Sequence, residues 1–309
     1  MLIVLETSLW RMGPDAAPAL LHDKPARAAA EGVSLHAVAF ADATVSIFQA
    51  DGKEASATVD DPAQCLLVLS EDPPVMLIGT EGAHLYRLQG PYLERVIAFD
   101  QLDCRRTWYT PWGGPPSVRS LAVSADGWVY ADIHVGSIMR SPDGGVSWQG
   151  VGTSLDEDVH QVAVCPADPR RVYANTASAV FISPDHGDSW THVGGGELRE
   201  RYGRAIAVCP TDPDFILASV SDGPHDGDLH AQLYRSHDGG QSWQQVVEGF
   251  PTSLPQNINT HHLAFDEHNV PWAVAGSDLY RGSADAARWE RVWTAPQPIG
   301  MISAKGARP

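Results

Sequence analysis

The chain has 309 residues, 43% of them hydrophobic, and carries a formal net charge of −17. An acidic surface repels polyanions, because nucleic-acid affinity depends on Lys and Arg displacing counterions from phosphates, so nucleic acid is not an expected partner. No apolar run is long enough to span a bilayer, which excludes a membrane-spanning protein.

The first segment of the chain, Leu2–Met12, is apolar and predicts two strands that lack an innermost partner. It has no basic region, is interrupted by Glu6 and offers no cleavage pattern, so it does not match a secretory signal peptide. The four cysteines form no CxxC pair, which favours buried thiols over a disulfide framework. We therefore expect a cytoplasmic protein.

The next third of the chain carries weaker strand patterns, in His36–Asp51 and Leu66–Leu88. An aromatic loop follows, in which Trp108, Tyr109 and Trp112 lie close together. These rings either form the wall of a pocket or fill the gap between two neighbouring sheets, and the sequence leaves both interpretations open.

Three segments then share the pattern Ser-x-Asp-x-Gly-x-x-Trp, at Ser141–Trp148, Ser183–Trp190 and Ser236–Trp243. The Asp side chain can accept hydrogen bonds from the backbone of its own turn, the Gly tolerates positive φ, and the Trp anchors the next strand in the core. A degenerate fourth copy occupies 283–289. Each segment predicts a hairpin turn between the third and fourth strands of a four-stranded sheet.

A second repeated pattern precedes each of these turns and predicts an innermost strand. The four copies are Val118–Ser124, Val159–Cys165, Gly203–Cys209 and Thr260–Asp266. The spacing is typical of propeller blades, and the length accommodates about seven units of roughly 44 residues, with six or eight as alternatives. Ile299–Ala304 would complete the first sheet. We predict one all-β domain over residues 1–309, a seven-bladed propeller of four-stranded antiparallel blades whose N- and C-terminal strands share a blade.

The three turns resemble the Asp-box, or BNR repeat, of sialidase-like propellers and of WD40/YVTN/BNR-like repeat proteins. That family includes sialidases, xyloglucan-active glycosidases, sortilin-type receptors and a photosystem assembly factor. The resemblance implies that Asp143, Asp185 and Asp238 are structural and that the active face is the opposite one. Sialidase activity is not expected. The N-terminal candidate for the sialidase arginine motif reads Trp10-Arg11-Met12, and only two arginines begin innermost strands, whereas sialidases use three to bind a carboxylate. Xyloglucan enzymes pair two propellers, and this chain has material for one.

The repeat alignment places four basic side chains at one position near the start of the innermost strands: Arg119, His160, Arg204 and His261, with Cys65 at the same place in an earlier blade. They should ring the mouth of the central channel, where two Arg and two His suit an anionic ligand. The alternative is that they only bind backbone carbonyls and channel water.

Loops on the same face contribute further polar groups: His134, Asp158, Tyr202, Glu81 and His84. Asp158 either orients His160 or is an ordinary loop residue. An insertion over residues 221–230 carries carboxylates and imidazoles that would bind a metal or simply form a solvated turn, and its spacing matches no known ligand motif.

The first functional hypothesis is a hydrolase or lyase, resembling glycosyl hydrolases in fold, that acts on a small anionic molecule. Arg119 and Arg204 would hold the anion, and His160 or His261 would serve as general acid or base, assisted by Asp158 and Tyr202. In a variant of this hypothesis His134, His160 and His261 coordinate a divalent metal ion, because neutral imidazoles suit Zn, Fe or Mn. The second hypothesis is a non-catalytic module that uses the same face to bind a protein partner or a ligand.

Overall fold

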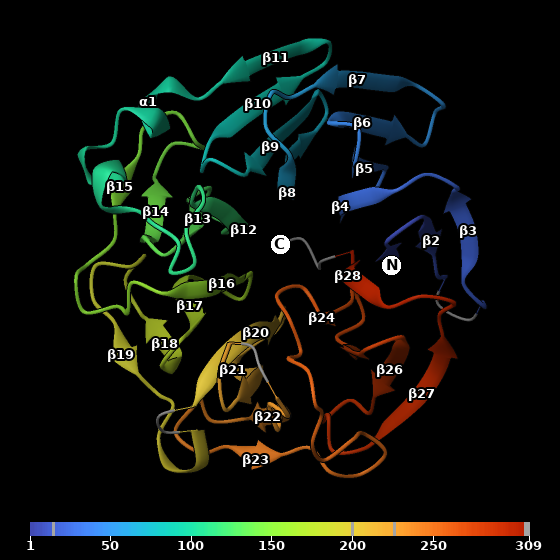
Figure 1. The fold of residues 1–309 in the computed structure, drawn as a ribbon, viewed down its shortest axis with the longest axis vertical. Coiled ribbons are helices and arrows are strands. Elements are labelled where there is room, and N and C mark those ends of the chain that lie inside the picture. The colour runs from blue at the N-terminus through green and yellow to red at the C-terminus, as the bar shows by residue number, and fades with distance from the viewer. Residues whose placement is uncertain (14–15, 199–200, 225–226, 306–309) are drawn as a thin grey trace.

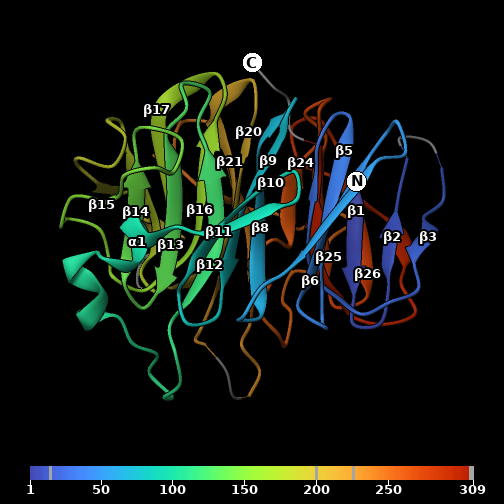
Figure 2. The same cartoon turned by 90° about the horizontal axis from the view of Figure 1, so that it is seen from above.

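The computed structural model describes residues 1–13, 16–198, 201–224 and 227–305, whose strands form seven four-stranded antiparallel sheets. Figure 1 shows the sheets as blades around a central axis, and Figure 2 shows from the side that the strands run between two faces where the loops gather. The predicted seven-bladed all-β propeller is confirmed.

The first three blades are assembled from the part of the chain without Asp-boxes. Blade one consists of β28 (Ile299–Ser303), β1 (Leu2–Leu5), β2 (Leu9–Arg11) and β3 (Ala19–His22). Blade two consists of β4 (Ala26–Glu31), β5 (Leu35–Phe40), β6 (Thr44–Gln49) and β7 (Glu54–Thr58). Blade three consists of β8 (Ala63–Glu71), β9 (Pro74–Thr80), β10 (Leu85–Gln89) and β11 (Tyr92–Arg95).

The remaining four blades contain the repeats. Blade four consists of β12 (Ser117–Val123), β13 (Val129–His134), β14 (Ser137–Ser141) and β15 (Gln149–Gly150). Blade five consists of β16 (Val159–Cys165), β17 (Asp168–Thr176), β18 (Ala179–Ser183) and β19 (Thr191–His192). Blade six consists of β20 (Tyr202–Cys209), β21 (Asp212–Ser221), β22 (Gln232–Ser236) and β23 (Gln244–Gln245). Blade seven consists of β24 (Leu263–Phe265), β25 (Pro271–Ala275), β26 (Asp278–Gly282) and β27 (Trp289–Thr294).

Helical segments are short and lie between blades: α1 (Ile97–Asp100), η1 (Asp103–Thr107) and η2 (Gly196–Leu198). Within the described ranges, none of these helices has the length and apolar character that crossing a bilayer would require.

Blade one joins the two ends of the described chain, as predicted. Strand β28 pairs antiparallel with β1, with Leu2 opposite Ser303 and Val4 opposite Met301. The innermost position of this blade is therefore filled by the last strand, and the edge of β1 that would otherwise be open is paired.

The Asp-box turns connect the third and fourth strands of their blades and use their carboxylates internally. Asp143 Oδ1 accepts hydrogen bonds from the Ser141 hydroxyl at 2.7 Å and from the Ser147 N–H at 2.8 Å. The Trp148 indole donates to the Gly145 carbonyl at 3.1 Å. Equivalent carboxylate bonds form in the second and third turns, and Ser283 keeps its bond to Asp285 at 2.6 Å in the degenerate copy. The Trp243 indole of the third turn donates instead to the Val193 carbonyl at 2.8 Å. These aspartates stabilise turns.

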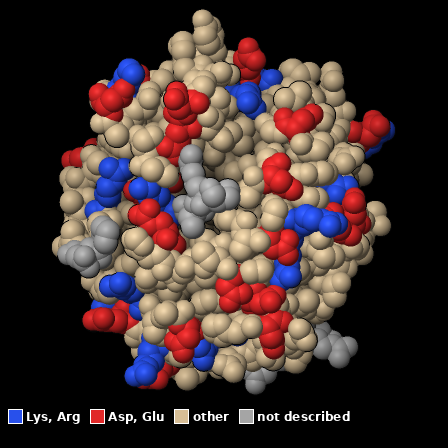
Figure 3. Space-filling model, turned by 180° about the vertical axis from the view of Figure 1, so that it is seen from behind, with Lys and Arg blue, Asp and Glu red and all other residues tan. Residues whose placement is uncertain are grey.

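Adjacent blades pack through apolar side chains, and glycine is required where they approach most closely. A Cβ atom on Gly79 of β9 would lie 2.6 Å from Cγ1 of Val118 on β12, well inside van der Waals contact. Figure 3 shows the molecule from behind, where acidic and basic side chains are interspersed and form no large patch of one sign. On this face the negative charge is therefore not concentrated in one place.

Candidate functional site

The face on which the innermost strands begin, called the site face below, lies opposite the Asp-box turns. His134 at the end of β13 pairs with Ser117 at the start of β12, whereas Ser141 at the beginning of the first Asp-box pairs with Val129 at the other end of β13. Side chains near the starts of the innermost strands therefore gather on one face, separate from the structural aspartates.

Five innermost strands share a β-bulge near their start, where their register with the second strand shifts. The residues in these bulges are Arg27, Gln64, Arg119, His160 and the pair Arg204 and Ala205. A bulge takes a side chain out of the strand's alternation and changes its direction. Arg119, His160 and Arg204 thus occupy equivalent positions, as the repeat alignment predicts.

Two details of that alignment need correction. Cys65 is not the equivalent residue in blade three, because Gln64 occupies the bulge and Cys65 is buried one position later. Arg27 of blade two is a third arginine at this position, and its guanidinium lies 3.6 Å from Glu81. Arg27 could not be aligned with the other residues from the sequence, because its blade contains no Asp-box.

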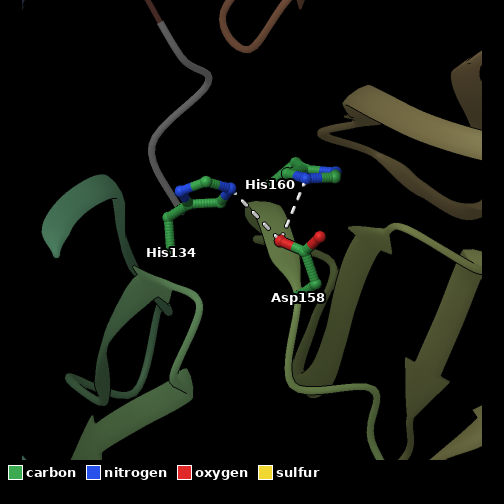
Figure 4. Close-up of side chains that lie close together, drawn as sticks. All are labelled: His134, Asp158 and His160. Carbon is green, nitrogen blue, oxygen red and sulfur yellow. Dashed lines mark ion pairs between the residues drawn. The ribbon is translucent and has the colours of Figure 1, made fainter. Parts of the chain in front are cut away.

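The centre of the site face holds a group called the site cluster: His134, Asp158 and His160. The Nε2 atoms of His134 and His160 lie 3.3 and 3.2 Å from the same oxygen, Oδ1 of Asp158. Figure 4 shows both imidazoles directed at the carboxylate, His134 from blade four and the other two residues from blade five. His160 is 0% and His134 2% exposed, whereas the Asp158 side chain is 23% exposed, so two buried imidazoles meet a partly exposed carboxylate.

The hydrogen bonds of His160 fix its tautomer. Its Nδ1 lies 2.5 Å from the Gly203 carbonyl oxygen, which can only accept, so Nδ1 carries the proton. Nε2 of the neutral ring therefore presents a lone pair, to which the Tyr202 hydroxyl donates at 2.9 Å. Burial lowers the pKa of His160 despite the neighbouring Asp158 carboxylate, which favours this neutral form.

The other two members of the site cluster are affected by the same surroundings. Burial, reinforced by the charge of Arg119, lowers the pKa of His134 to about 3. Burial alone would raise the pKa of Asp158, but His160, His134 and Arg119 lower it, so the carboxylate is charged. Asp158 Oδ1 nevertheless makes no hydrogen bond of acceptable geometry with a described residue. The cluster thus contains neutral imidazoles around a charged and incompletely satisfied oxygen.

Two arginines border the site cluster with unused donors. Nη1 of Arg119 and Nε of Arg204 are buried and have no hydrogen-bond partner among the described residues. Burial lowers the pKa of Arg119, and repulsion from Arg204 adds to that effect. The nearby carboxyl of Asp132 has its pKa raised to about 7 by burial and therefore offsets these charges only partly. Positive charge with free N–H groups is an arrangement that suits an anion.

A pocket of about 240 Å³ opens beside the site cluster. This pocket is called the site pocket below, and it is lined by Pro111, Trp112, His134, Asp158, Tyr202 and Pro224. The size suits a small molecule, because sites for larger ligands are typically about 300–1,000 Å³.

The aromatic loop serves both of its expected purposes. The Trp112 ring lies 5.0 Å from the His134 ring and forms the wall of the site pocket. Trp108 is buried and packs against Phe99, with ring centroids 5.7 Å apart. One residue of the loop thus contributes to the site and the other to the core.

The structure does not bring His261 into the site cluster, which corrects both the predicted ring and the predicted metal set of His134, His160 and His261. Among the described residues the group of possible ligands is His134, Asp158 and His160. His261 occupies a turn with φ 63° before β24, which begins only at Leu263. Its Nε2 lies 3.4 Å from the Arg119 carbonyl, and Thr260 donates to the His160 carbonyl at 2.8 Å. Thr260 and His261 of blade seven therefore hydrogen-bond to the backbone of blades five and four near the site cluster.

Other predicted loop residues form separate contacts. His84 lies 2.7 Å from Asp100, and Glu81 accepts a hydrogen bond from Gln64 at 2.7 Å. In the insertion, His230 pairs with Asp222 at 2.8 Å, whereas His225 and Asp226 lie outside the described residues. None of these described pairs belongs to the group of possible metal ligands.

A larger cavity of about 480 Å³ lies at the other end of the innermost strands. Its lining is mostly backbone and apolar side chains, with Glu31 and Lys305 as the charged members among the described residues. Glu31 is already paired with Arg11 at 3.5 Å. The smaller site pocket is the stronger candidate, because converging donor and acceptor atoms rather than volume define a functional site.

Comparisons with known proteins agree with this architecture. A family model described as sortilin, neurotensin receptor 3 matches residues 136–292, just over half of the chain. No curated protein matches the sequence.

Solved structures show the same fold at low sequence identity. An ancestral GH74 enzyme is 16% identical with a TM-score of 0.66, covering 87% of this chain and 38% of its own. The GH74 xyloglucanase from Xanthomonas campestris is 16% identical with a TM-score of 0.62, covering 87% and 45%. YCF48 bound to D1 peptide is 15% identical with a TM-score of 0.59, covering 88% and 83%. The chain spans less than half the length of these two GH74 enzymes.

Proposed function

We propose that this chain, which belongs to the sortilin, neurotensin receptor 3 family, is a hydrolase or lyase that acts on a small anionic substrate in the site pocket. The observation that carries the proposal is the convergence of His134 Nε2, His160 Nε2 and Asp158 Oδ1 beside an open pocket. Such buried groups of acceptors are typical of sites that activate water or remove a proton.

The roles of the individual residues follow from their charges. Arg119 and Arg204 would hold the anion, because one buried N–H group of each has no acceptor among the described residues. The site cluster would supply the lone pairs that activate the attacking water or take the substrate proton. The Tyr202 hydroxyl donates to His160 Nε2 at 2.9 Å, and it would hold that lone pair until water or substrate takes the place of the hydroxyl. Similarity in fold to GH74 enzymes is compatible with hydrolysis, and the proposal does not depend on their substrates.

The test is a turnover assay on the whole chain with chromogenic phosphate, sulfate and carboxylate esters. His160→Ala should lower turnover by about 10²-fold or more, because it removes a group in direct reach of the substrate. His268→Ala is the matched control, since His268 is exposed and remote from the site pocket. Equal turnover in His160→Ala and the control would overturn the assignment.

A second candidate function is a binding module that captures a protein or a ligand on the same face. It is favoured by the segment of residues 260–262, because Thr260 and His261 are used in bonds to the carbonyls of His160 and Arg119 within the protein. The similarity to YCF48, solved with a bound peptide, also favours it. In that case Arg119→Met and Arg204→Met would weaken capture of an acidic peptide while no ester in the assay is turned over.

A further inference from the structure

We propose that the site cluster is a metal site, in which His134 Nε2, Asp158 Oδ1 and His160 Nε2 bind one divalent transition-metal ion, best zinc, and leave a fourth position open to the site pocket. The inference specifies how the site cluster acts and rests on the proposed function for its purpose. Metal binding itself is measurable without any turnover, so the two proposals can fail separately.

The distances between the donor atoms fit a tetrahedral metal. Zinc binds imidazole nitrogen and carboxylate oxygen at about 2.0–2.2 Å, which separates neighbouring ligand atoms of a tetrahedron by roughly 3.3–3.5 Å. The two distances to Asp158 Oδ1 are 3.3 and 3.2 Å, and all three atoms lie within 4.8 Å of one another. Side-chain shifts of a few tenths of an ångström would bring the three atoms around one ion.

Within the site cluster no proton lies between His160 Nε2 and Asp158 Oδ1. The proton of His160 is on Nδ1, bonded to the Gly203 carbonyl, so Nε2 and Asp158 Oδ1 face each other as two acceptors 3.2 Å apart. The Tyr202 hydroxyl donates to Nε2 at 2.9 Å, and a bound ion would take its place. Asp158 Oδ1 is buried and lacks a well-formed hydrogen bond among the described residues. Two acceptors held this close in a buried place repel one another, and a cation between them would turn that repulsion into attraction.

The surroundings provide the usual supports of a metal-binding histidine. A ligating imidazole normally donates its other N–H to a carbonyl or carboxylate, and His160 does so to Gly203. Gly203 itself cannot be replaced without disturbance, because a Cβ there would lie 1.8 Å from Asn175 Oδ1. The carbonyl that orients His160 is thus held in place by its own close packing.

The number and type of donors point to an open site rather than a closed one. Two imidazoles and one carboxylate, with a vacant fourth position, form the ligand type of catalytic zinc sites, whereas structural sites are closed by four protein ligands. The fourth direction is available because His134, Asp158 and Tyr202 line the site pocket. Bordering charges of Arg119 and Arg204 would oppose a bare cation and favour one that shares an anion with them.

The experiment is a calorimetric titration of the chelator-treated full chain with zinc chloride in a chloride buffer. We expect one tight equivalent in the wild type, and a loss of affinity of roughly 100-fold or more in His134→Ala and in Asp158→Asn. His268→Ala should bind as the wild type does, and circular dichroism would verify that each variant is folded. Equal zinc affinity in the wild type and Asp158→Asn would overturn the site.

Cobalt provides a readout that does not depend on affinity. Co²⁺ in a tetrahedral site of nitrogen and oxygen donors gives intense visible absorption, which weakly bound octahedral Co²⁺ lacks. The wild type should show that absorption at one equivalent and Asp158→Asn should not. A wild-type spectrum typical of octahedral Co²⁺ would count against the tetrahedral arrangement proposed here.

The anion separates this inference from the proposed function. If Arg119 and Arg204 hold an anion next to the metal, zinc and added sulfate should each tighten the binding of the other, and Arg119→Met should remove the coupling. Zinc binding without a sulfate effect would support the metal site and contradict the proposed anionic substrate. Turnover that persists unchanged in the zinc-free Asp158→Asn variant would support an enzyme and contradict the metal.

Discussion

His262 and the pair formed by His134 and His160 differ in their hydrogen bonds. His262 has a backbone partner at each nitrogen: Nδ1 accepts from the Asn259 N–H at 3.2 Å, and Nε2 lies 3.1 Å from the Gly300 carbonyl. His134 and His160 instead share one carboxylate oxygen that is poorly satisfied. Burial lowers the pKa of His262 to about 4 and that of His134 to about 3, so burial alone does not distinguish His262 from the histidines of the site cluster.

A buried histidine is structural when the backbone provides hydrogen-bond partners for both of its nitrogens. His262 connects the start of blade seven to β28 of blade one, where the ring of blades closes. His160 uses one nitrogen in the same structural way and keeps the other for its neighbours. We therefore expect substitution of His262 to lower mainly the stability of the protein, and substitutions in the site cluster to lower mainly zinc binding and turnover.

The largest effect on stability is expected for His262→Ala. Removal of a side chain that is 6% exposed and bonded at both nitrogens should cost about 2–4 kcal/mol in the free energy of unfolding, because two backbone groups lose their partners. Denaturant titration would measure this cost, and zinc binding should be retained in the folded fraction. A stable His262→Ala with impaired zinc binding would reverse the comparison.

The pH dependence of the unfolding free energy should report the change between the neutral and the protonated form of His262. Its pKa in the folded state is about 4, below the unfolded value of 6.5, so its contribution is complete above pH 6.5 and is lost as the pH falls toward 4. The loss amounts to roughly 3 kcal/mol at 1.4 kcal/mol per pKa unit. His262→Gln, which retains one donor and one acceptor, should flatten this part of the profile.

Other groups change with pH as well, and the comparison of variants removes them. Asp132 acts in the opposite direction, because its raised pKa of about 7 makes the folded state less stable as the pH rises toward neutrality. It is present in both proteins, so the difference between wild type and His262→Gln isolates His262. Parallel profiles for the two proteins would contradict the assigned pKa.

A smaller loss is expected for Gly203→Ala. The new Cβ would overlap Asn175 Oδ1, and accommodation of such a clash typically costs about 1–3 kcal/mol. The displacement should also move the carbonyl that orients His160 and so weaken zinc binding about 10-fold. Calorimetry and thermal unfolding on the same sample would measure both, and unchanged zinc affinity would show that the carbonyl does not orient the ligand.

The smallest effect on stability belongs to Tyr202→Phe. It deletes a hydroxyl that donates to His160 Nε2 at the border of the site pocket, and the unfolding free energy should change by less than about 1 kcal/mol. The same change should lower turnover several-fold. A large stability loss with normal turnover would assign Tyr202 to the structural class of His262.

Much of the fold could be predicted from the sequence because the Asp-boxes repeat at the spacing of a blade. The four-stranded blades, the closure by residues 299–303 and the choice of face all followed from that pattern. The site was predicted only in part, since bulges insert a residue into a strand without any local signal. Arg27 was missed and Cys65 was misaligned for that reason.

His261 was predicted to join His134 and His160 for a related reason. His261 matches the repeat in sequence, but the innermost strand of blade seven has only the three residues Leu263–Phe265, so His261 falls in the preceding turn. Asp158 is one residue before β16 and two before His160, and its side chain enters the cluster from the loop. The distance between blades that places His134 beside both residues is set by the curvature of the ring, which alternation within one strand does not encode.

Closure of blade one by β28 also constrains the order in which the chain folds. During synthesis β1 emerges long before its innermost partner β28, with Leu2 opposite Ser303 in the folded protein. Until β28 leaves the ribosome, β1 has an unpaired edge that is open to other nascent chains. Contacts of such long sequence separation form slowly, so ring closure rather than blade formation should limit the rate of folding.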